Sequence, residues 1–285
     1  MSPIVHHKAA WMVWEALNLE LTGFGIAMLL AFLVAQQVCQ AELTRRNQLA
    51  GAAAMPDITI GAVIGGLLGA KIYYAALMGN VFDLFHRSGF VFWGGLIGGV
   101  LATYFVIRWK KLPFSRISDV AGIGISAAYA VGRTGCWAVG DDYGRPWTGP
   151  LAVSFPEGSP PSTVGNLSTL FGVKGLEGRP LGDVVSVYPT QLFEVAMGLV
   201  MFAILWRMRD HKHAEGWLFG VYCVLAGTER FIVVFFRAKD DRFFGTFSLA
   251  QLIAVGFVLA GVVWMRMRRE VRAGAPGIQA SGQRA

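Results

Sequence analysis

The sequence predicts an all-α polytopic membrane protein, with about seven transmembrane helices around a lipid-accessible cavity. Of its 285 residues 54% are hydrophobic and 15% are charged, whereas soluble domains carry about 25% charged residues. The mean hydropathy is +0.50. Apolar runs of about 17–25 residues recur along the chain, and helices of that length can cross a bilayer. An insertion on the outer side is expected between the fourth and fifth spans.

Three spans are predicted in the first part of the chain. Leu21–Val38 is a continuous apolar run, and Ile58–Met78 is rich in glycine and contains Lys71. The third span, Phe90–Ile107, contains the run Phe92–Gly99 (FWGGLIGG), whose small residues have a GxxxG-like spacing. This spacing is more often a sign of close helix packing than of chemistry.

Four further spans follow. The fourth span is less apolar than the others because it contains glycines and Arg133. The fifth begins directly after Pro189, which suits a first helical turn. The sixth contains Arg230. The seventh precedes a basic segment. In order, they are Asp119–Val139, Thr190–Trp206, Gly216–Phe236 and Phe247–Met265.

The distribution of basic residues predicts the orientation. With the N-terminus outside and the C-terminus in the cytoplasm, 14 basic residues lie inside and 8 outside, as the positive-inside rule requires. The net charge of +7 then reflects topology, and no nucleic-acid partner is expected. We expect residues 1–272 to form a single transmembrane domain with the outer-side insertion at about 141–189, and residues 273–285 to be a disordered tail.

Cysteine usage argues against disulfides and metal sites. The three cysteines lie in or beside apolar runs, without CxxC or CxxH spacing: Cys39, Cys136 and Cys223. We therefore expect neither a disulfide framework nor a metal site, and no cofactor. For Cys136 in particular, a small buried hydrophobe is a better interpretation than a covalent nucleophile.

Three cations in apolar surroundings indicate an anion-binding site. Arg133, Lys71 and Arg230 each lie within a predicted span, and few internal acids are apparent beside them. A charge there is costly and normally faces a bundle interior or a cavity. In a membrane the commonest suitable anion is a phospholipid headgroup. The segment Gly132–Pro146 adds glycines, a second arginine and the acids Asp141 and Asp142 at the exit of the fourth span.

Four stretches resemble the bacterial phosphatidylglycerol–prolipoprotein diacylglyceryl transferases. The motif HGGLIG matches Trp93–Gly98 except at its first position, and GRxGNFxNGExxG matches Gly132–Gly144. HPSQLYE matches Tyr188–Glu194, and RxxVEFFR matches Arg230–Arg237. The order and spacing of the motifs agree along most of the chain, as do seven spans with an outer N-terminus.

The resemblance implies an enzyme of the bacterial inner membrane, with its N-terminus in the periplasm. Nothing in the sequence demands more than a monomer. It would transfer the diacylglyceryl group of phosphatidylglycerol to the lipobox cysteine of a prolipoprotein, forming a thioether and releasing glycerol phosphate. Arg133 and Arg230 would bind the phosphate and Asp141 would accept the thiol proton. Gln191 and Glu194 would hold the arginines in place. The full set of expected binding residues is Arg237, Lys71, Trp93, Gly94, Gly95, Cys136, Gln191 and Glu194.

Several positions depart from the family pattern. Trp93 replaces a histidine, Cys136 an asparagine, Asp141 a glutamate, Val234 a glutamate and Phe24 a tyrosine. A catalytically altered paralogue that binds phospholipid or uses another acceptor is therefore an alternative. A small-anion transporter is a further one, although the sequence lacks a pair of broken helices or an inverted repeat.

Overall fold

The computed structural model describes residues 12–14, 19–85, 89–238, 242–244 and 247–269, so the expected disordered tail lies outside the described residues. Helices dominate this part of the chain, accompanied by two short antiparallel strand pairs. In chain order the elements are β1 (Met12–Trp14), β2 (Leu19–Leu21), α1 (Gly23–Arg45), α2 (Leu49–Met78), η2 (Val81–Phe85), α3 (Phe92–Trp109), α4 (Phe114–Val139), α5 (Val164–Thr169), α6 (Thr190–Met208), α7 (Trp217–Val233), β3 (Arg242–Phe244), β4 (Phe247–Ser248) and α8 (Leu249–Met267).

Each of the seven predicted apolar segments overlaps one long helix. Among the described residues, α1, α2, α3, α6 and α8 are long and apolar enough to cross a membrane. Some predicted spans were shorter than the helices: α1 continues to Arg45, and α4 begins at Phe114. Helices continue past their apolar windows because their polar ends find partners: Glu42 accepts hydrogen bonds from Arg45 and Arg46 within the last turns of α1.

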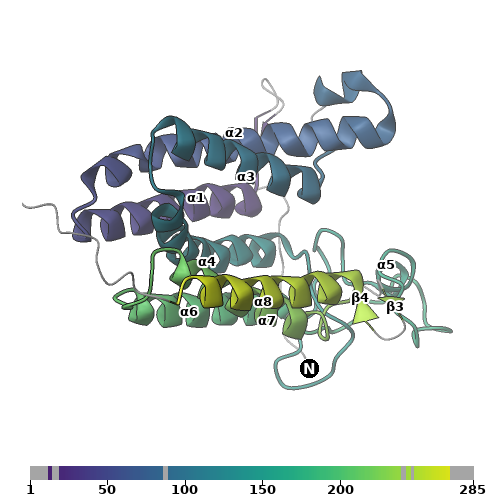
Figure 1. Ribbon diagram of the computed structural model, residues 1–285. Coiled ribbons are helices and arrows are strands. Elements are labelled where there is room, and N and C mark those ends of the chain that lie inside the picture. The colour runs from purple at the N-terminus through teal and green to yellow at the C-terminus, as the bar shows by residue number, and fades with distance from the viewer. Residues whose placement is uncertain (1–11, 15–18, 86–88, 239–241, 245–246, 270–285) are drawn as a thin grey trace, which may run out of the picture.

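Helix α4 occupies the middle of the bundle. In Figure 1, α1, α2 and α3 lie on one side of it and α6, α7 and α8 on the other. Helix α4 packs directly against α1, α6 and α7, whereas α8 packs against α7. A central helix that carries Arg133 can therefore meet side chains from both halves of the bundle.

Glycines bring α2 and α3 into backbone contact. A Cβ atom at Gly65 would lie 2.6 Å from the carbonyl oxygen of Gly98, and one at Gly94 would overlap the carbonyl oxygen of Gly69. Such small residues let two membrane helices approach closely and gain van der Waals contact. The GxxxG-like run at the start of α3 therefore packs against α2.

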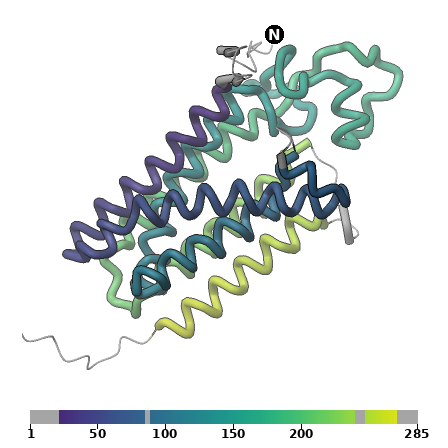
Figure 2. The backbone as a smooth tube through the Cα atoms, turned by 90° about the horizontal axis from the view of Figure 1, so that it is seen from above, coloured from purple at the N-terminus to yellow at the C-terminus, as the bar shows by residue number. Residues whose placement is uncertain are grey.

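The insertion between α4 and α6 is an ordered unit at one end of the bundle (Figure 2). It has its own small core, in which Tyr143 stacks on Phe155 with ring centroids 5.5 Å apart and Val187 is fully buried. The amide of Gly144 donates to the carbonyl of Tyr188 over 2.9 Å. This hydrogen bond joins the two ends of the insertion. It thereby holds Asp141 and Asp142, which follow α4, beside the start of α6.

Asp119 was predicted to be the first residue of the fourth span, but it lies inside α4, which begins at Phe114. Its carboxylate accepts hydrogen bonds from the backbone amides of Gly216, over 2.6 Å, and Phe219, over 2.9 Å, at the start of α7. Helix α7 has no side-chain cap of its own. A fully buried carboxylate from α4 satisfies its first amides and interacts favourably with its dipole, which fixes α7, and with it Arg230, against the central helix.

Candidate functional site

Backbone geometry at the end of α4 turns two acids back toward Arg133. Gly140 ends the helix in the left-handed region with φ 66°, and Asp142 also has a positive φ, 55°. Glycine adopts this region freely, and aspartate is among the few other residues that tolerate it. Thr190 donates to the Asp142 carbonyl over 2.7 Å, and Gln191 donates to the Asp141 carbonyl over 2.6 Å. The first turn of α6 thus holds the acidic turn in place.

Arg133 is paired with two carboxylates. One of its Nη atoms lies 2.8 Å from Asp142 and the other lies 2.9 Å from Glu194. The expectation of few internal acids beside the buried cations was therefore wrong. The acids that compensate Arg133 come from the turn after α4 and from α6, and neither precedes Arg133 along its own helix.

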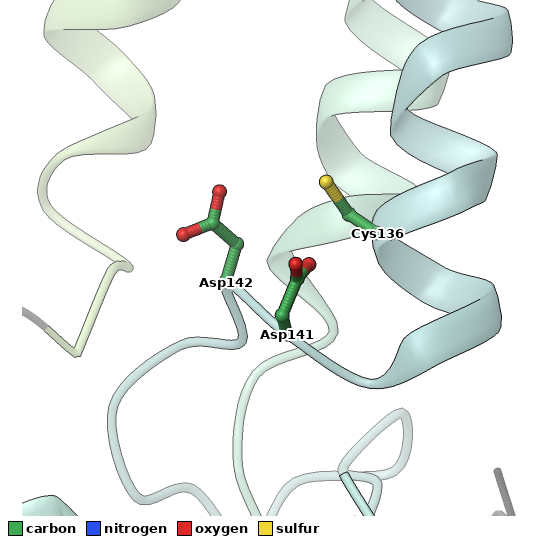
Figure 3. A group of neighbouring side chains, drawn as sticks. All are labelled: Cys136, Asp141 and Asp142. Carbon is green, nitrogen blue, oxygen red and sulfur yellow. The ribbon is translucent and has the colours of Figure 1, made fainter. Parts of the chain in front are cut away.

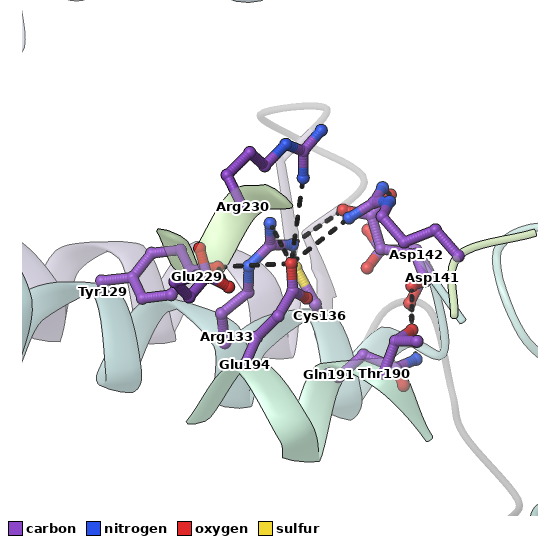
Figure 4. Close-up of polar contacts among 11 residues, drawn as sticks. Tyr129, Arg133, Cys136, Asp141, Asp142, Thr190, Gln191, Glu194, Glu229 and Arg230 are labelled. Carbon is purple, nitrogen blue, oxygen red and sulfur yellow. Dashed lines mark hydrogen bonds and ion pairs between the residues drawn. The ribbon is translucent and has the colours of Figure 1, made fainter. Parts of the chain in front are cut away.

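Three guanidinium groups converge on one oxygen atom of Glu194, and Figure 4 shows those of Arg133 and Arg230. The Oε1 atom lies 2.9 Å from Arg133, 3.4 Å from Arg237 and 4.0 Å from Arg230. The Glu194 side chain is fully buried. A buried carboxylate is stable only when it is paired and hydrogen-bonded, so the arginines and Glu194 fix each other. Glu194 thus contacts the arginines that it was expected to hold in place, while its part in the reaction stays a prediction.

Asp142 connects two of these arginines. It bonds to Arg133 through one carboxylate oxygen and makes a short ion pair with Arg237 through the other. Burial opposes its ionisation, but the guanidiniums of Arg237 and Arg133 outweigh burial and hold the pKa of Asp142 below its usual range. The sequence analysis named both acids and assigned the thiol proton to Asp141. The structure gives Asp142 the bridging position.

Asp141 has a different environment. Burial and the negative charge of Asp142 raise the pKa of Asp141 to about 6. Its Oδ1 atom is buried and has no hydrogen-bond partner among the described residues. Asp141 is therefore a carboxylate whose protonation changes near neutral pH, as a general base requires.

Cys136 lies beside both acids (Figure 3). Its Sγ atom and one oxygen of each of Asp141 and Asp142 lie within 4.8 Å of one another, which is close enough for a metal ion to bind them together. However, Arg133 donates to Cys136 Sγ over 3.4 Å and to Asp142 over 2.8 Å. A guanidinium in that place would repel a cation, so the geometry favours an anion or a neutral ligand.

A cavity of about 650 Å³ leads to this cluster. Over most of its length it is lined by apolar side chains of α1 to α4, including Phe24, Phe32, Ile58 and Ile125. Its polar lining residues come from one end of α4 and the turn that follows, together with a few side chains of α1 to α3. The polar residues from α4 and this turn are Tyr129, Arg133, Cys136, Asp141 and Asp142. The cavity therefore combines a long apolar wall with a charged end.

The structure does not bring all expected site residues together. Lys71 lies over the ring of Phe90, 4.5 Å from its centroid, and Trp93 packs edge-on against Phe92. Gly94 packs on α2, as described above, and so does Gly95, where a Cβ atom would lie 3.3 Å from the carbonyl oxygen of Gly66. In the described part of the chain, none of Lys71, Trp93, Gly94 and Gly95 lines the 650 Å³ cavity. Their role in substrate binding stays a prediction.

The sequence analysis gave no role to two residues of the site. They are Tyr129 from α4 and Glu229 from α7. The hydroxyl of Tyr129 is within hydrogen-bond distance of the carboxyl groups of both Glu194 and Glu229. Tyr129 precedes Arg133 by one helical turn, and Glu229 directly precedes Arg230. The spacing of four residues places Tyr129 and Arg133 on one helix face and was a usable signal for Tyr129. The convergence of α4 and α7 was not visible in the sequence.

Comparison with known proteins shows the family of this chain. Residues 12–267 match the family described as prolipoprotein diacylglyceryl transferase. The similar proteins that are named phosphatidylglycerol–prolipoprotein diacylglyceryl transferase include three from different bacteria. The one from Bordetella parapertussis is 30% identical over 211 residues, 71% of each chain. The one from Geobacter sulfurreducens is 26% identical over 257 residues, 86% of this chain and 90% of its own.

The third, from Corynebacterium diphtheriae, is 28% identical over 266 residues, which is 88% of each chain. The family match extends from β1 to the last residue of α8 and includes every residue of the arginine and carboxylate cluster. This protein belongs to the prolipoprotein diacylglyceryl transferase family.

Proposed function

We propose that this protein transfers the diacylglyceryl group of phosphatidylglycerol to the lipobox cysteine of prolipoproteins, as the names of its relatives indicate. The observation that carries the proposal is the 650 Å³ cavity, which is lined mainly by apolar side chains and has Arg133 at its charged end. A phospholipid has the same division, with acyl chains at one end and an anionic phosphate at the other. Family membership and cavity chemistry therefore support the same substrate.

The arginine cluster is suited to the phosphate. Arginine binds phosphate oxygens through two parallel hydrogen bonds and stays charged in a buried site. Glu194 and Asp142 keep Arg133, Arg230 and Arg237 close together in spite of their mutual repulsion. A phosphate that enters from the cavity meets guanidiniums that are already in position, so little further ordering is needed when charge develops on the leaving group.

The transfer exchanges one bond for another. The substrate thiolate attacks the terminal glyceryl carbon that bears the phosphate, a carbon–sulfur bond forms, and the bond from that carbon to the phosphate oxygen breaks. The electron pair leaves with glycerol phosphate, where the arginines stabilise the charge. Asp141 takes the thiol proton. With its pKa at about 6, it is mostly ionised at neutral pH, and the nearby guanidiniums favour the thiolate.

The basic residues at one end of the bundle support a seven-span topology in the bacterial inner membrane. Arg46 donates to the Arg209 carbonyl over 2.9 Å and Arg116 pairs with Glu215 at 2.6 Å, so the end of α1 and the start of α4 share a basic face with the α6–α7 connection. The insertion follows the opposite end of α4. The positive-inside rule assigns the basic face to the cytoplasm and the insertion, with the N-terminus, to the periplasm.

A lipidation assay tests the proposed function. Purified protein is incubated with phosphatidylglycerol and a lipobox peptide, and thioether-linked diacylglyceryl is measured by mass spectrometry. We expect transfer by the native chain, no detectable transfer by Arg133→Ala or Arg230→Ala, and a mild loss in Cys136→Ala. Absence of transfer above a control without protein, when the native chain is folded, would reject the activity. Complete loss in Cys136→Ala would indicate a covalent route.

A further inference from the structure

The hydroxyl of Tyr129 lies between two buried carboxyl groups (Figure 4). Its oxygen is 2.9 Å from Glu229 Oε1 and 3.2 Å from Glu194 Oε1. Glu229 is 7% exposed and Glu194 is not exposed at all. Three helices meet here, since Tyr129 comes from α4, Glu194 from α6 and Glu229 from α7.

One proton cannot satisfy this arrangement if both carboxyl groups are ionised. A tyrosine hydroxyl has one hydrogen to donate and can also accept, whereas an ionised carboxylate only accepts. With both acids charged, one carboxylate oxygen would face the lone pairs of Tyr129 at hydrogen-bond distance in a buried site. A buried polar group without a partner is costly. The geometry is satisfied when one acid is protonated and donates to Tyr129, which donates to the other acid.

The surrounding charges decide which acid carries the proton. Glu194 is in contact with three guanidiniums, so it remains the anion. Within the described residues, Tyr129 is the hydrogen-bond partner of the Glu229 carboxyl. The other charged groups near Glu229 are Arg133 from α4 and its chain neighbour Arg230, while α8 presents Ala254 and Val258 to this part of α7.

We propose that Glu229 is a neutral carboxylic acid that, through Tyr129, positions the Glu194 carboxylate against the phosphate-binding arginines. The hydrogen bonds then run from Glu229 to Tyr129 and from Tyr129 to Glu194. The ring of Tyr129 also lies beside the Arg133 guanidinium, 5.4 Å from its central carbon. Tyr129 and Glu229 are thus positioning residues for the reaction proposed above, on which the functional part of this inference rests.

Substitutions at Glu229 separate a neutral donor from an anion. Glutamine has the shape of glutamate and an amide that can donate to Tyr129, so Glu229→Gln should retain transfer within about threefold of the native rate. Glu229→Ala and Tyr129→Phe interrupt the chain, and each should lower kcat roughly tenfold or more, with a smaller effect on the KM for the peptide. If Glu229→Gln is as impaired as Glu229→Ala while remaining folded, Glu229 is not a neutral donor and the proposal fails.

Infrared spectroscopy gives a readout that does not depend on activity. The native protein in detergent should show the carbonyl stretch of a protonated carboxylic acid, and this band should shift in heavy water. The spectrum of Glu229→Gln should lack the band. If the native protein and Glu229→Gln have the same spectrum in this region, the proposal is overturned even if both proteins are active. Conversely, if the native protein transfers no lipid but the band is present, the proposed function fails and the protonation of Glu229 stands.

Discussion

Replacement of Glu194 by glutamine tests how the arginine cluster is held together. The substitution preserves the size of the side chain and removes its charge. In the structure, Oε1 of Glu194 lies 2.9 Å from Arg133 and 3.4 Å from Arg237. The variant leaves Asp142 as the carboxylate that pairs with these two arginines, so their repulsion is less well balanced. We expect the guanidiniums to separate and the phosphate to meet a less ordered site.

The magnitude follows from the contacts that are lost. A hydrogen bond to a charged group contributes about 1.5–3 kcal/mol. The contact of Glu194 with Arg133 has good geometry and is well buried, whereas the contacts with Arg237 and Arg230 are longer. One strong contact and two weaker ones give a loss of about 2–4 kcal/mol. If this loss falls on the transition state, kcat/KM decreases about 30-fold to 1000-fold, since a tenfold change corresponds to about 1.36 kcal/mol.

The assay is lipidation of a lipobox peptide, with kcat and KM measured separately and thermal unfolding recorded in the same detergent. Glu177→Gln is the matched control, because Glu177 is exposed on the insertion; it should leave both quantities unchanged. The reasoning requires that Glu194→Gln loses activity while the protein still unfolds cooperatively. A folded Glu194→Gln protein with native kcat/KM would refute the role assigned to this carboxylate.

Three further predictions concern protonation, packing and capping. Since burial raises the pKa of Asp141 to about 6 and the base acts as a carboxylate, kcat/KM should rise with pH through about 6; Asp141→Asn should be slow and lack this limb in a pH–rate profile. Gly65→Ala places a Cβ atom 2.6 Å from the Gly98 carbonyl oxygen and should lower the Tm by an overpacking cost of about 1–3 kcal/mol, whereas Gly256→Ala, which meets nothing within 4 Å, should be neutral or stabilising. Asp119→Ala leaves two amides at the start of α7 without their acceptor and should cost about 1–3 kcal/mol for each; Asp119→Asn, which keeps one acceptor oxygen, should cost less in the same unfolding measurement. An unchanged Tm in Asp119→Ala would contradict the cap.

Local patterns in the sequence predicted the helices well. Whether a segment is apolar over the thickness of a bilayer depends only on neighbouring residues, so each of the seven predicted segments overlaps a long helix. The ends were less predictable, because α1 and α4 extend beyond their apolar windows into turns whose side chains form ion pairs, Arg45 with Glu42 and Arg116 with Glu215. The small residues at the start of α3 correctly indicated close packing, although the partner helix α2 was visible only in the structure.

The sequence alone determined that this protein places arginines among apolar helices, and its motifs indicated an anionic lipid as their ligand. Only the tertiary structure decided what those arginines contact. Asp142 meets Arg237 across 95 residues, Tyr129 meets Glu229 across 100, and Asp119 meets Gly216 across 97. A buried charge must be compensated by whichever group the fold brings within hydrogen-bond distance, and that group does not have to be near it in the chain.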